Sequence, residues 1–126
     1  LRIEGNTYLV VGDALSMPFK SSVFDVVESW FGLGNIIGFR RVIGQAYRVL
    51  KSGGCFIVSG AWGEAYLNPR FSIYGKVIES LTAKEYEKLI EFLKRTELML
   101  HVNEIIKAFK STGFHDIEVF EKTTFT

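Results

Sequence analysis

Residues with the means to do chemistry gather where apolar runs of the chain end. Asp13 follows the first run, Glu28–Phe31 ends the second, and Ser59–Trp62 ends the third. A carboxylate such as Asp13 can accept from an exocyclic amine while the next backbone amide donates to a ring nitrogen, which is how a strand end reads the edge of adenine. For a lone aspartate we favour the plainer interpretation, a cap on the turn made with amides near Leu15.

The other candidates have equally plain interpretations. Asp25 lies inside the second run, where a carboxylate is costly unless it is hydrogen-bonded, so we expect it to accept from amides of a neighbouring turn. The rings of Trp30 and Phe31 suit either a flat apolar ligand or the core, and the sequence does not choose. Cys55 opens an apolar run and is expected to be a small buried hydrophobe.

Neither metal nor disulfide chemistry is indicated. His101 and His115 have no ligand-like spacing to each other or to Cys55, so we predict no zinc site. A single cysteine forms no internal disulfide, and no signal peptide is visible, so a reducing cytoplasm is expected. No Ser/Cys–His–Asp arrangement stands out.

The strands and helices that must position these residues follow from hydrophobic spacing. Three runs are apolar at consecutive positions, which predicts strands covered on both faces, as in a parallel sheet: Tyr8–Val11, Val23–Val27 and Cys55–Ser59. Helical spacing predicts helices over 36–50, with Ile36, Phe39, Ile43, Ala46, Tyr47 and Leu50 on one stripe, 82–98 and 102–112. Lys51–Gly54 ends the first of these helices, Thr82 and Glu85 form a capping box, and Gly113 ends the last.

The remaining stretches are less regular. Residues 60–80 read as a loop with room for a short helix, and Phe114–Phe125 reads as one or two strands with Ile117, Val119 and Phe125 inward. A solvated helix face is predicted from a mixed charge pattern: Glu85, Glu87, Lys88, Glu91, Lys94, Arg95 and Glu97.

Composition limits the class of protein. The 126 residues make one domain, 1–126, and 48% hydrophobic, 14% aromatic and 23% charged residues exclude intrinsic disorder. A formal net charge of +1 indicates neither a nucleic-acid nor a membrane-surface partner, and no apolar run approaches the roughly 18 residues of a membrane span. Strands separated by helices predict an α/β sheet with right-handed crossovers, whose ligands sit beyond the carboxyl ends of the strands.

Three motifs in order carry a family resemblance. Gly12-Asp13-Ala14-Leu15-Ser16-Met17-Pro18-Phe19, Phe24-Asp25-Val26-Val27 and Tyr47-Arg48-Val49-Leu50-Lys51-Ser52-Gly53-Gly54 resemble class I S-adenosylmethionine-dependent methyltransferases. The nearest likeness is to the small-molecule branch of the ubiquinone/menaquinone-biosynthesis C-methyltransferases. Met17 stands for the leucine of that pattern and Ser52 for its proline. The resemblance implies a truncated Rossmann-like methyltransferase sandwich of three layers, mostly parallel, with C-terminal antiparallel strands.

The resemblance also implies roles for individual residues. Asp13 would accept from the adenine amino group of S-adenosylmethionine, and the Ala14 amide would face an adenine ring nitrogen. Leu15 and Met17 would line the adenine pocket. Three further cofactor-binding residues would flank the methionine end and the transferred methyl: Ser29, Trp30 and Phe31. Residues 61–100 occupy the place of a variable substrate cover.

One departure from the family pattern is large. The family's glycine-rich first strand and the acidic end of its second strand have no counterpart before Tyr8, which amounts to two strand–helix units. At roughly 1–3 kcal/mol for each lost contact, the loss of several weakens cofactor binding by the isolated chain about a thousandfold or more. The opening Leu1, in place of Met, favours a segment of a longer protein.

The same departure predicts association with another chain. The missing strands would lie between Tyr8–Val11 and Val23–Val27, which leaves the second of these strands with an unpaired parallel edge. We therefore expect a homo-oligomer such as a dimer, or a complementing chain, unless Tyr8–Val11 moves over to pair with that edge.

Two functions follow from this reasoning. The first is methyl transfer to a small molecule by the C-terminal part of a methyltransferase, with the remainder supplied from elsewhere. The second is a non-catalytic methyltransferase-like module for assembly or partner binding. An aromatic cover suits a flat apolar acceptor: Trp62, Tyr66, Phe71 and Tyr74. The sequence singles out no general base among the residues considered for that role: Glu28, Glu64, Tyr66 and His101.

Overall fold

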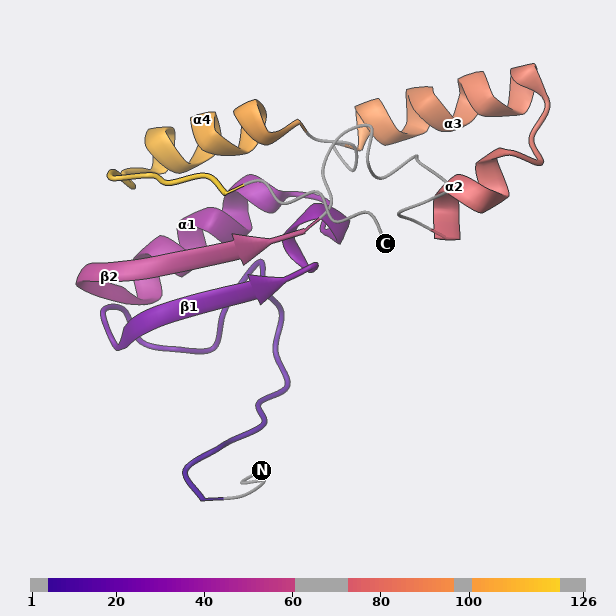
Figure 1. Ribbon diagram of the computed structural model, residues 1–126. Helices are drawn as coiled ribbons and strands as arrows, with labels where there is room; N and C mark the ends of the chain where they lie inside the picture. Colours follow the sequence, from indigo (N-terminus) through magenta and orange to yellow (C-terminus); the bar gives the residue numbers. More distant parts are fainter. Residues whose placement is uncertain (1–4, 61–72, 97–100, 121–126) are drawn as a thin grey trace.

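A computed structural model describes residues 5–60, 73–96 and 101–120 (Figure 1). The elements follow in the order β1 (Phe24–Trp30), a single 3-10 turn (Leu33–Asn35), α1 (Phe39–Val49), β2 (Leu50–Ser59), α2 (Ile73–Ile78), α3 (Ala83–Arg95) and α4 (Val102–Thr112). No helix in this part of the chain has the length and apolar character needed to cross a membrane.

The sheet confirms the α/β class with parallel strands. β1 and β2 pair in parallel from Val26 opposite Cys55 to Trp30 opposite Ser59. The register jumps between Phe24 and Val26, because Lys51–Gly54 bulges out of β2. Gly53 has a φ of +79°, a conformation that favours glycine. The glycine pair predicted to end the helix therefore forms a bulge within β2.

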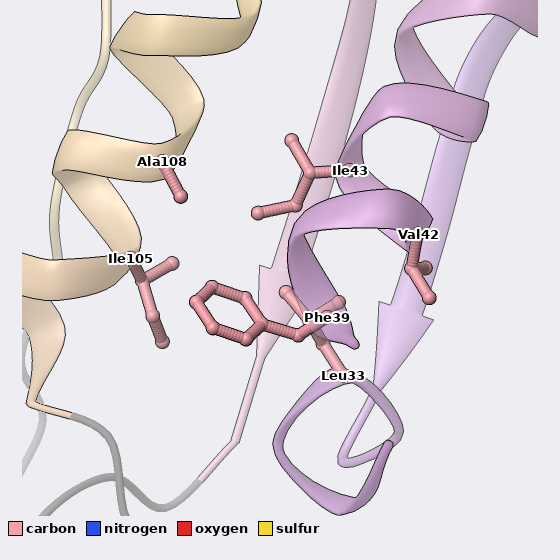
Figure 2. Close-up of a cluster of buried hydrophobic side chains, with 6 residues drawn as sticks. All are labelled: Leu33, Phe39, Val42, Ile43, Ile105 and Ala108. Atoms are coloured by element: carbon pink, nitrogen blue, oxygen red, sulfur yellow. The ribbon is translucent and has the colours of Figure 1, made fainter. Parts of the chain in front are cut away.

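Helix α1 supplies half of the buried hydrophobic residues in the described part of the chain. It begins at Phe39, after Gly38 with a φ of +87°. The core cluster joins α1 and the preceding turn to α4 (Figure 2): Leu33, Phe39, Val42, Ile43, Ile105 and Ala108. The predicted stripe holds at Phe39, Ile43 and Ala46, whereas Tyr47 is 48% exposed because it turns to meet the Phe114 ring edge-on at 5.1 Å.

The two helices cover one face of the sheet. On β2, Phe56 and Val58 pack against the core cluster, and the Phe56 ring lies 5.3 Å from that of Phe109 on α4. On the other face Val26 is 50% and Ile57 47% exposed. The prediction that the strands are covered on both faces is therefore wrong for the described residues, which form one helical layer on one sheet. The other two described helices, α2 and α3, lie away from the sheet in Figure 1.

The segment Tyr8–Val11 does not form the predicted buried strand. Apart from an isolated bridge at Tyr8 it is irregular, and all four side chains are exposed, Val11 by 97%. In the described residues β1 pairs with β2 alone, so this segment has no strand beside it to complete a ladder. In Figure 1 it runs away from the sheet.

The predicted C-terminal strands do not form over residues 114–120. This stretch is irregular, with Asp116 in the left-handed region at a φ of +54°. Phe114 instead turns into an aromatic cluster, 5.2 Å from Phe109 and 5.9 Å from Phe56 between ring centroids. The rest of the prediction, 121–125, lies outside the described residues.

The other helices agree with the sequence. α3 begins at the predicted capping box, in which the Glu85 N–H donates to Thr82 Oγ1 over 3.3 Å and the Thr82 N–H donates to Glu85 Oε2 over 2.8 Å. Leu93 is its buried residue, and the predicted charge face from Glu85 to Arg95 is exposed. α4 ends at Gly113 as predicted. Of the predicted cover, residues 61–72 and the side chain of Tyr74 lie outside the described part.

Candidate functional site

A cavity of about 380 Å³ opens between the loop that follows Tyr8–Val11 and the strand β1. Its walls are mostly apolar: Val10, Gly12, Asp13, Ala14, Met17, Pro18, Phe19, Phe24, Val26, Val27 and Val49. A mostly apolar cavity with a few polar groups at one side is the usual form of a small-molecule site. Of the predicted cofactor residues, Asp13, Ala14 and Met17 meet here.

Asp13 caps its turn and also lines the cavity. Its Oδ1 accepts from the Leu15 N–H over 2.9 Å, and its carbonyl accepts from the Ser16 N–H over 3.0 Å, so the turn-cap interpretation is confirmed. The residue nonetheless lines the cavity and is exposed. Within the described residues no hydrogen bond uses its Oδ2 or the Ala14 N–H, so two adjacent residues keep an acceptor and a donor for another partner.

The loop after Asp13 is anchored to α1. The Met17 N–H donates to Gln45 Oε1 over 3.1 Å, and Arg48 on the same helix also bonds to the loop. On the other side, a Cβ on Gly12 would lie 2.9 Å from the Pro18 ring, so glycine permits this close approach. Sequence reasoning missed Gln45 and Arg48 as parts of the site; their three-residue spacing, which puts them on one helix face, was the available signal.

Leu15 takes a different position from its neighbours. Its side chain packs against the core cluster, and its Cδ2 would lie 3.4 Å from a Cβ on Gly38. It is not among the residues that line the cavity. Its contribution to an adenine pocket remains a prediction.

The carboxyl end of β1 forms a second, separate group of predicted residues. Ser29 is half-buried, while Trp30 and Phe31 are exposed by 74% and 63%, which excludes core packing for both rings in the described structure. The Trp30 Nε1–H donates to Glu28 Oε2 over 3.3 Å. Phe31 lines a broad groove together with Ser59. Ser29, Trp30 and Phe31 are all absent from the lining of the cavity around Asp13.

Phe31 has an unusual backbone conformation. Its φ of +53° is in the left-handed region, which a bulky side chain seldom adopts. Two hydrogen bonds hold it there: the Phe31 N–H donates to the Ser59 carbonyl over 2.8 Å, and Asn35 Nδ2 donates to the Phe31 carbonyl over 2.6 Å. Backbone strain of this kind tends to be kept at functional sites.

Two other sequence expectations are corrected. Asp25 accepts from Lys51 Nζ over 3.3 Å instead of from turn amides, because its side chain points to solvent beside the bulge of β2. Cys55 is exposed, because strand alternation puts it on the uncovered face of the sheet.

Among the described residues no three His, Cys, Asp or Glu side chains gather as a metal site would require.

The residues considered as bases are scattered. Glu28 is engaged with Trp30, and His101 is exposed at the start of α4, where its N–H donates to Glu104 Oε2 over 3.0 Å. Glu64 and Tyr66 lie outside the described residues. No described residue therefore stands out as a general base.

Sequence comparison places this chain in a known family. The model of the ubiE/COQ5 methyltransferase family matches residues 3–126. The demethylmenaquinone methyltransferase of Geobacillus sp. (strain WCH70) is 33% identical in an alignment 124 positions long, which covers 90% of this chain and 51% of the relative. The ubiquinone/menaquinone biosynthesis C-methyltransferase of Cereibacter sphaeroides (strain ATCC 17029) is 47% identical over 49 residues, 39% of this chain and 20% of the relative. The chain spans about half the length of demethylmenaquinone methyltransferases that it matches.

Solved structures agree on the fold. An S-adenosylmethionine-dependent methyltransferase from Thermotoga maritima superposes with a TM-score of 0.57 at 24% identity, over 86% of this chain and 46% of that one. A Bacillus halodurans protein described as a methyltransferase superposes with a TM-score of 0.54 at 22% identity, over 82% of this chain and 39% of that one. With a family model that covers nearly every residue, the chain belongs to the ubiE/COQ5 methyltransferase family.

Proposed function

We propose that this chain contributes the adenine side of an S-adenosylmethionine site and takes part in methyl transfer to a small molecule. The observation that carries the proposal is the cavity at Asp13, whose mostly apolar wall includes Asp13 and Ala14. Among the described residues, Asp13 Oδ2 and the Ala14 N–H make no hydrogen bond. The family membership supports it, because relatives carry methyltransferase names.

The lining residues fit a purine. Adenine offers an exocyclic amine beside a ring acceptor, and this donor–acceptor pair complements the carboxylate of Asp13 and the N–H of Ala14. The faces of a flat ring would contact apolar side chains of the same cavity, such as Val10 and Met17. Asp13 Oδ1 accepts from the Leu15 N–H, so the turn would hold the carboxylate in place for the ligand.

For methyl transfer, the protein mainly has to place the cofactor and the acceptor in line. The bound cofactor supplies a methyl group on a sulfonium, which an acceptor nucleophile displaces in line. This chain's residues would orient the nucleoside and exclude water, and both effects lower the barrier. Trp30 and Phe31, exposed at the end of β1, are the proposed contacts at the methionine end and the transferred methyl, where two aromatic surfaces also suit a flat apolar acceptor.

A second polypeptide segment is part of the proposal. The cavity holds groups for one edge of the nucleoside, while the edge of β1 away from β2 is unpaired in the described residues. We propose that a complementing chain or a second copy pairs along this edge and completes the site in the cytoplasm. The isolated chain would then bind the cofactor weakly.

Calorimetric titration of the full chain with S-adenosylmethionine tests the proposal. We expect weak saturable binding, and Asp13→Asn should reduce the affinity about tenfold, because an amide presents a donor where the amine of adenine needs an acceptor. Asp25→Asn is the matched control, since Asp25 is exposed and lies outside the cavity. Equal binding by Asp13→Asn and the parent would contradict the assignment of the cavity, and no heat at millimolar ligand would favour the non-catalytic module.

A further inference from the structure

Arg48 ties the wall of the cavity to the end of α1. Its Nη1 donates to the Phe19 carbonyl over 2.7 Å and to Ser21 Oγ over 3.4 Å, while Nη2 donates to the Met17 carbonyl and to Gln45 Oε1, each over 3.0 Å. Met17 and Phe19 both line the cavity, but Arg48 does not. One guanidinium therefore holds two wall residues from behind.

The geometry is specific to arginine. A planar guanidinium carries five donors in a rigid fork, so it can bind two carbonyls two residues apart while it also reaches a third group. A lysine ammonium is a compact charge that could serve one of them. Arg48 also lies in the last turn of α1, where a cation interacts favourably with the helix dipole.

The main chain fixes the far end of the same loop independently. The Ser22 N–H donates to the Arg48 carbonyl over 2.9 Å, and the Val23 N–H donates to the Val49 carbonyl over 2.8 Å. These bonds do not need the Arg48 side chain. The contacts of the guanidinium with the loop fall within residues 17–21, between this point and the Asp13 turn.

We propose that Arg48 is a positioning residue that sets the affinity of the cavity for a purine nucleoside without touching it. The inference rests on the proposed function. Without the fork, Met17 and Phe19 lose the bonds that aim their backbone, and the apolar wall moves away from the ring it would cover. The Met17 N–H would also lose a well-placed acceptor, because Gln45 Oε1 is held by Nη2.

The test uses two variants of Arg48 and two readouts. Amide hydrogen exchange, read at single residues by NMR, reports the loop without any ligand; calorimetry with S-adenosylmethionine, and with adenosine as the smaller probe, reports affinity. In Arg48→Met we expect faster exchange at Met17, parental exchange at Val23, and about tenfold weaker binding of both ligands. The exchange rate at Met17 and the ligand affinity of Arg48→Lys should fall between those of Arg48→Met and the parent. Arg41→Met, at an exposed position on the same helix, should match the parent in both measurements.

Two results would overturn the proposal. Parental exchange at Met17 in Arg48→Met would show that the fork does not hold the wall. Faster exchange with unchanged affinity would show that the wall does not set binding. If the parent itself binds neither ligand, the proposed function fails and the role of Arg48 in affinity fails with it, while the exchange data still decide whether its side chain holds the loop.

Discussion

Individual residues of the site can serve the fold and a ligand with different atoms. Asp13 lines the cavity and caps its turn with Oδ1, which leaves Oδ2 for the proposed contact with adenine. An aspartate after a strand would usually be assigned one role or the other. Its two carboxylate oxygens allow both, and the cap orients the carboxylate so that its loss of side-chain freedom precedes ligand binding.

The left-handed backbone conformation of Phe31 should lower the stability of the protein. Phe31→Gly removes the steric penalty of a φ of +53°, and little packing is lost because the ring is 63% exposed. We expect the free energy of unfolding to rise by about 1 kcal/mol, measured by thermal denaturation. Asn35→Ala should lower it, since the 2.6 Å bond to the Phe31 carbonyl is lost. A Phe31→Gly protein less stable than the parent would contradict this expectation.

Two helix glycines give opposite predictions. Gly44, inside α1, has nothing within 4 Å of a built Cβ, so Gly44→Ala should raise the free energy of unfolding by about 0.5–1 kcal/mol. Gly113 has a φ of +125°, and a Cβ would lie 2.9 Å from the Tyr47 ring. Gly113→Ala should therefore lower stability by about 1–2 kcal/mol and disturb the Tyr47–Phe114 contact. Chemical denaturation of both variants checks the pair, and equal shifts would contradict it.

The capping box of α3 predicts a response to acid. Hydrogen bonds from the Thr82 backbone N–H and hydroxyl hold the pKa of Glu85 below its ordinary value of 4.5. A carboxyl group with a lowered pKa in the folded state stabilises the helix above the unfolded value, and this contribution is lost as the pH falls through the folded one. Amide NMR shifts of α3 should therefore report fraying below about pH 4.5.

Variants separate this box from general acid effects. Glu85→Gln should flatten the acid response of the first turn of α3, because the charge is gone at every pH. Glu91→Gln, exposed on the same helix, should keep the parental curve. An unchanged acid response in Glu85→Gln would assign the fraying to other carboxylates.

At the scale of the molecule, the described residues form a sheet with one covered and one uncovered face. α1 and α4 share the side of Phe56 and Val58, and the opposite side exposes Val26, Trp30 and Ile57. The unpaired edge of β1 adjoins that side in the described residues. An apolar face next to an open edge is the kind of surface through which sheets associate.

Charges placed on this face should weaken association. We expect the full chain to elute above monomer mass in size-exclusion chromatography with light scattering, and Val26→Lys with Ile57→Lys to shift it toward the monomer. Val77→Lys is the control, since Val77 is 57% exposed on α2 and does not belong to the sheet. A monomeric parent at high concentration would leave a complementing chain as the partner, and an unaffected oligomer would place the interface elsewhere.

Local chemistry made part of this protein predictable from its sequence. The helices at Phe39, Ala83 and Val102, the capping box, the Gly113 stop and the parallel strand pair follow from spacing and from backbone preferences, which act over a few residues. The turn at Asp13 follows from the same short-range rules, and the ordered motifs indicated the family.

Long-range packing determined the rest. Whether Val26 and Cys55 are buried depends on what lies over the second sheet face, and Tyr8–Val11 is irregular because a strand needs a neighbour for its hydrogen bonds. The reach of Arg48 across 31 residues to the Met17 carbonyl depends on the placement of α1 beside the loop. Such contacts join positions far apart in the chain, so no local pattern of residue types encodes them.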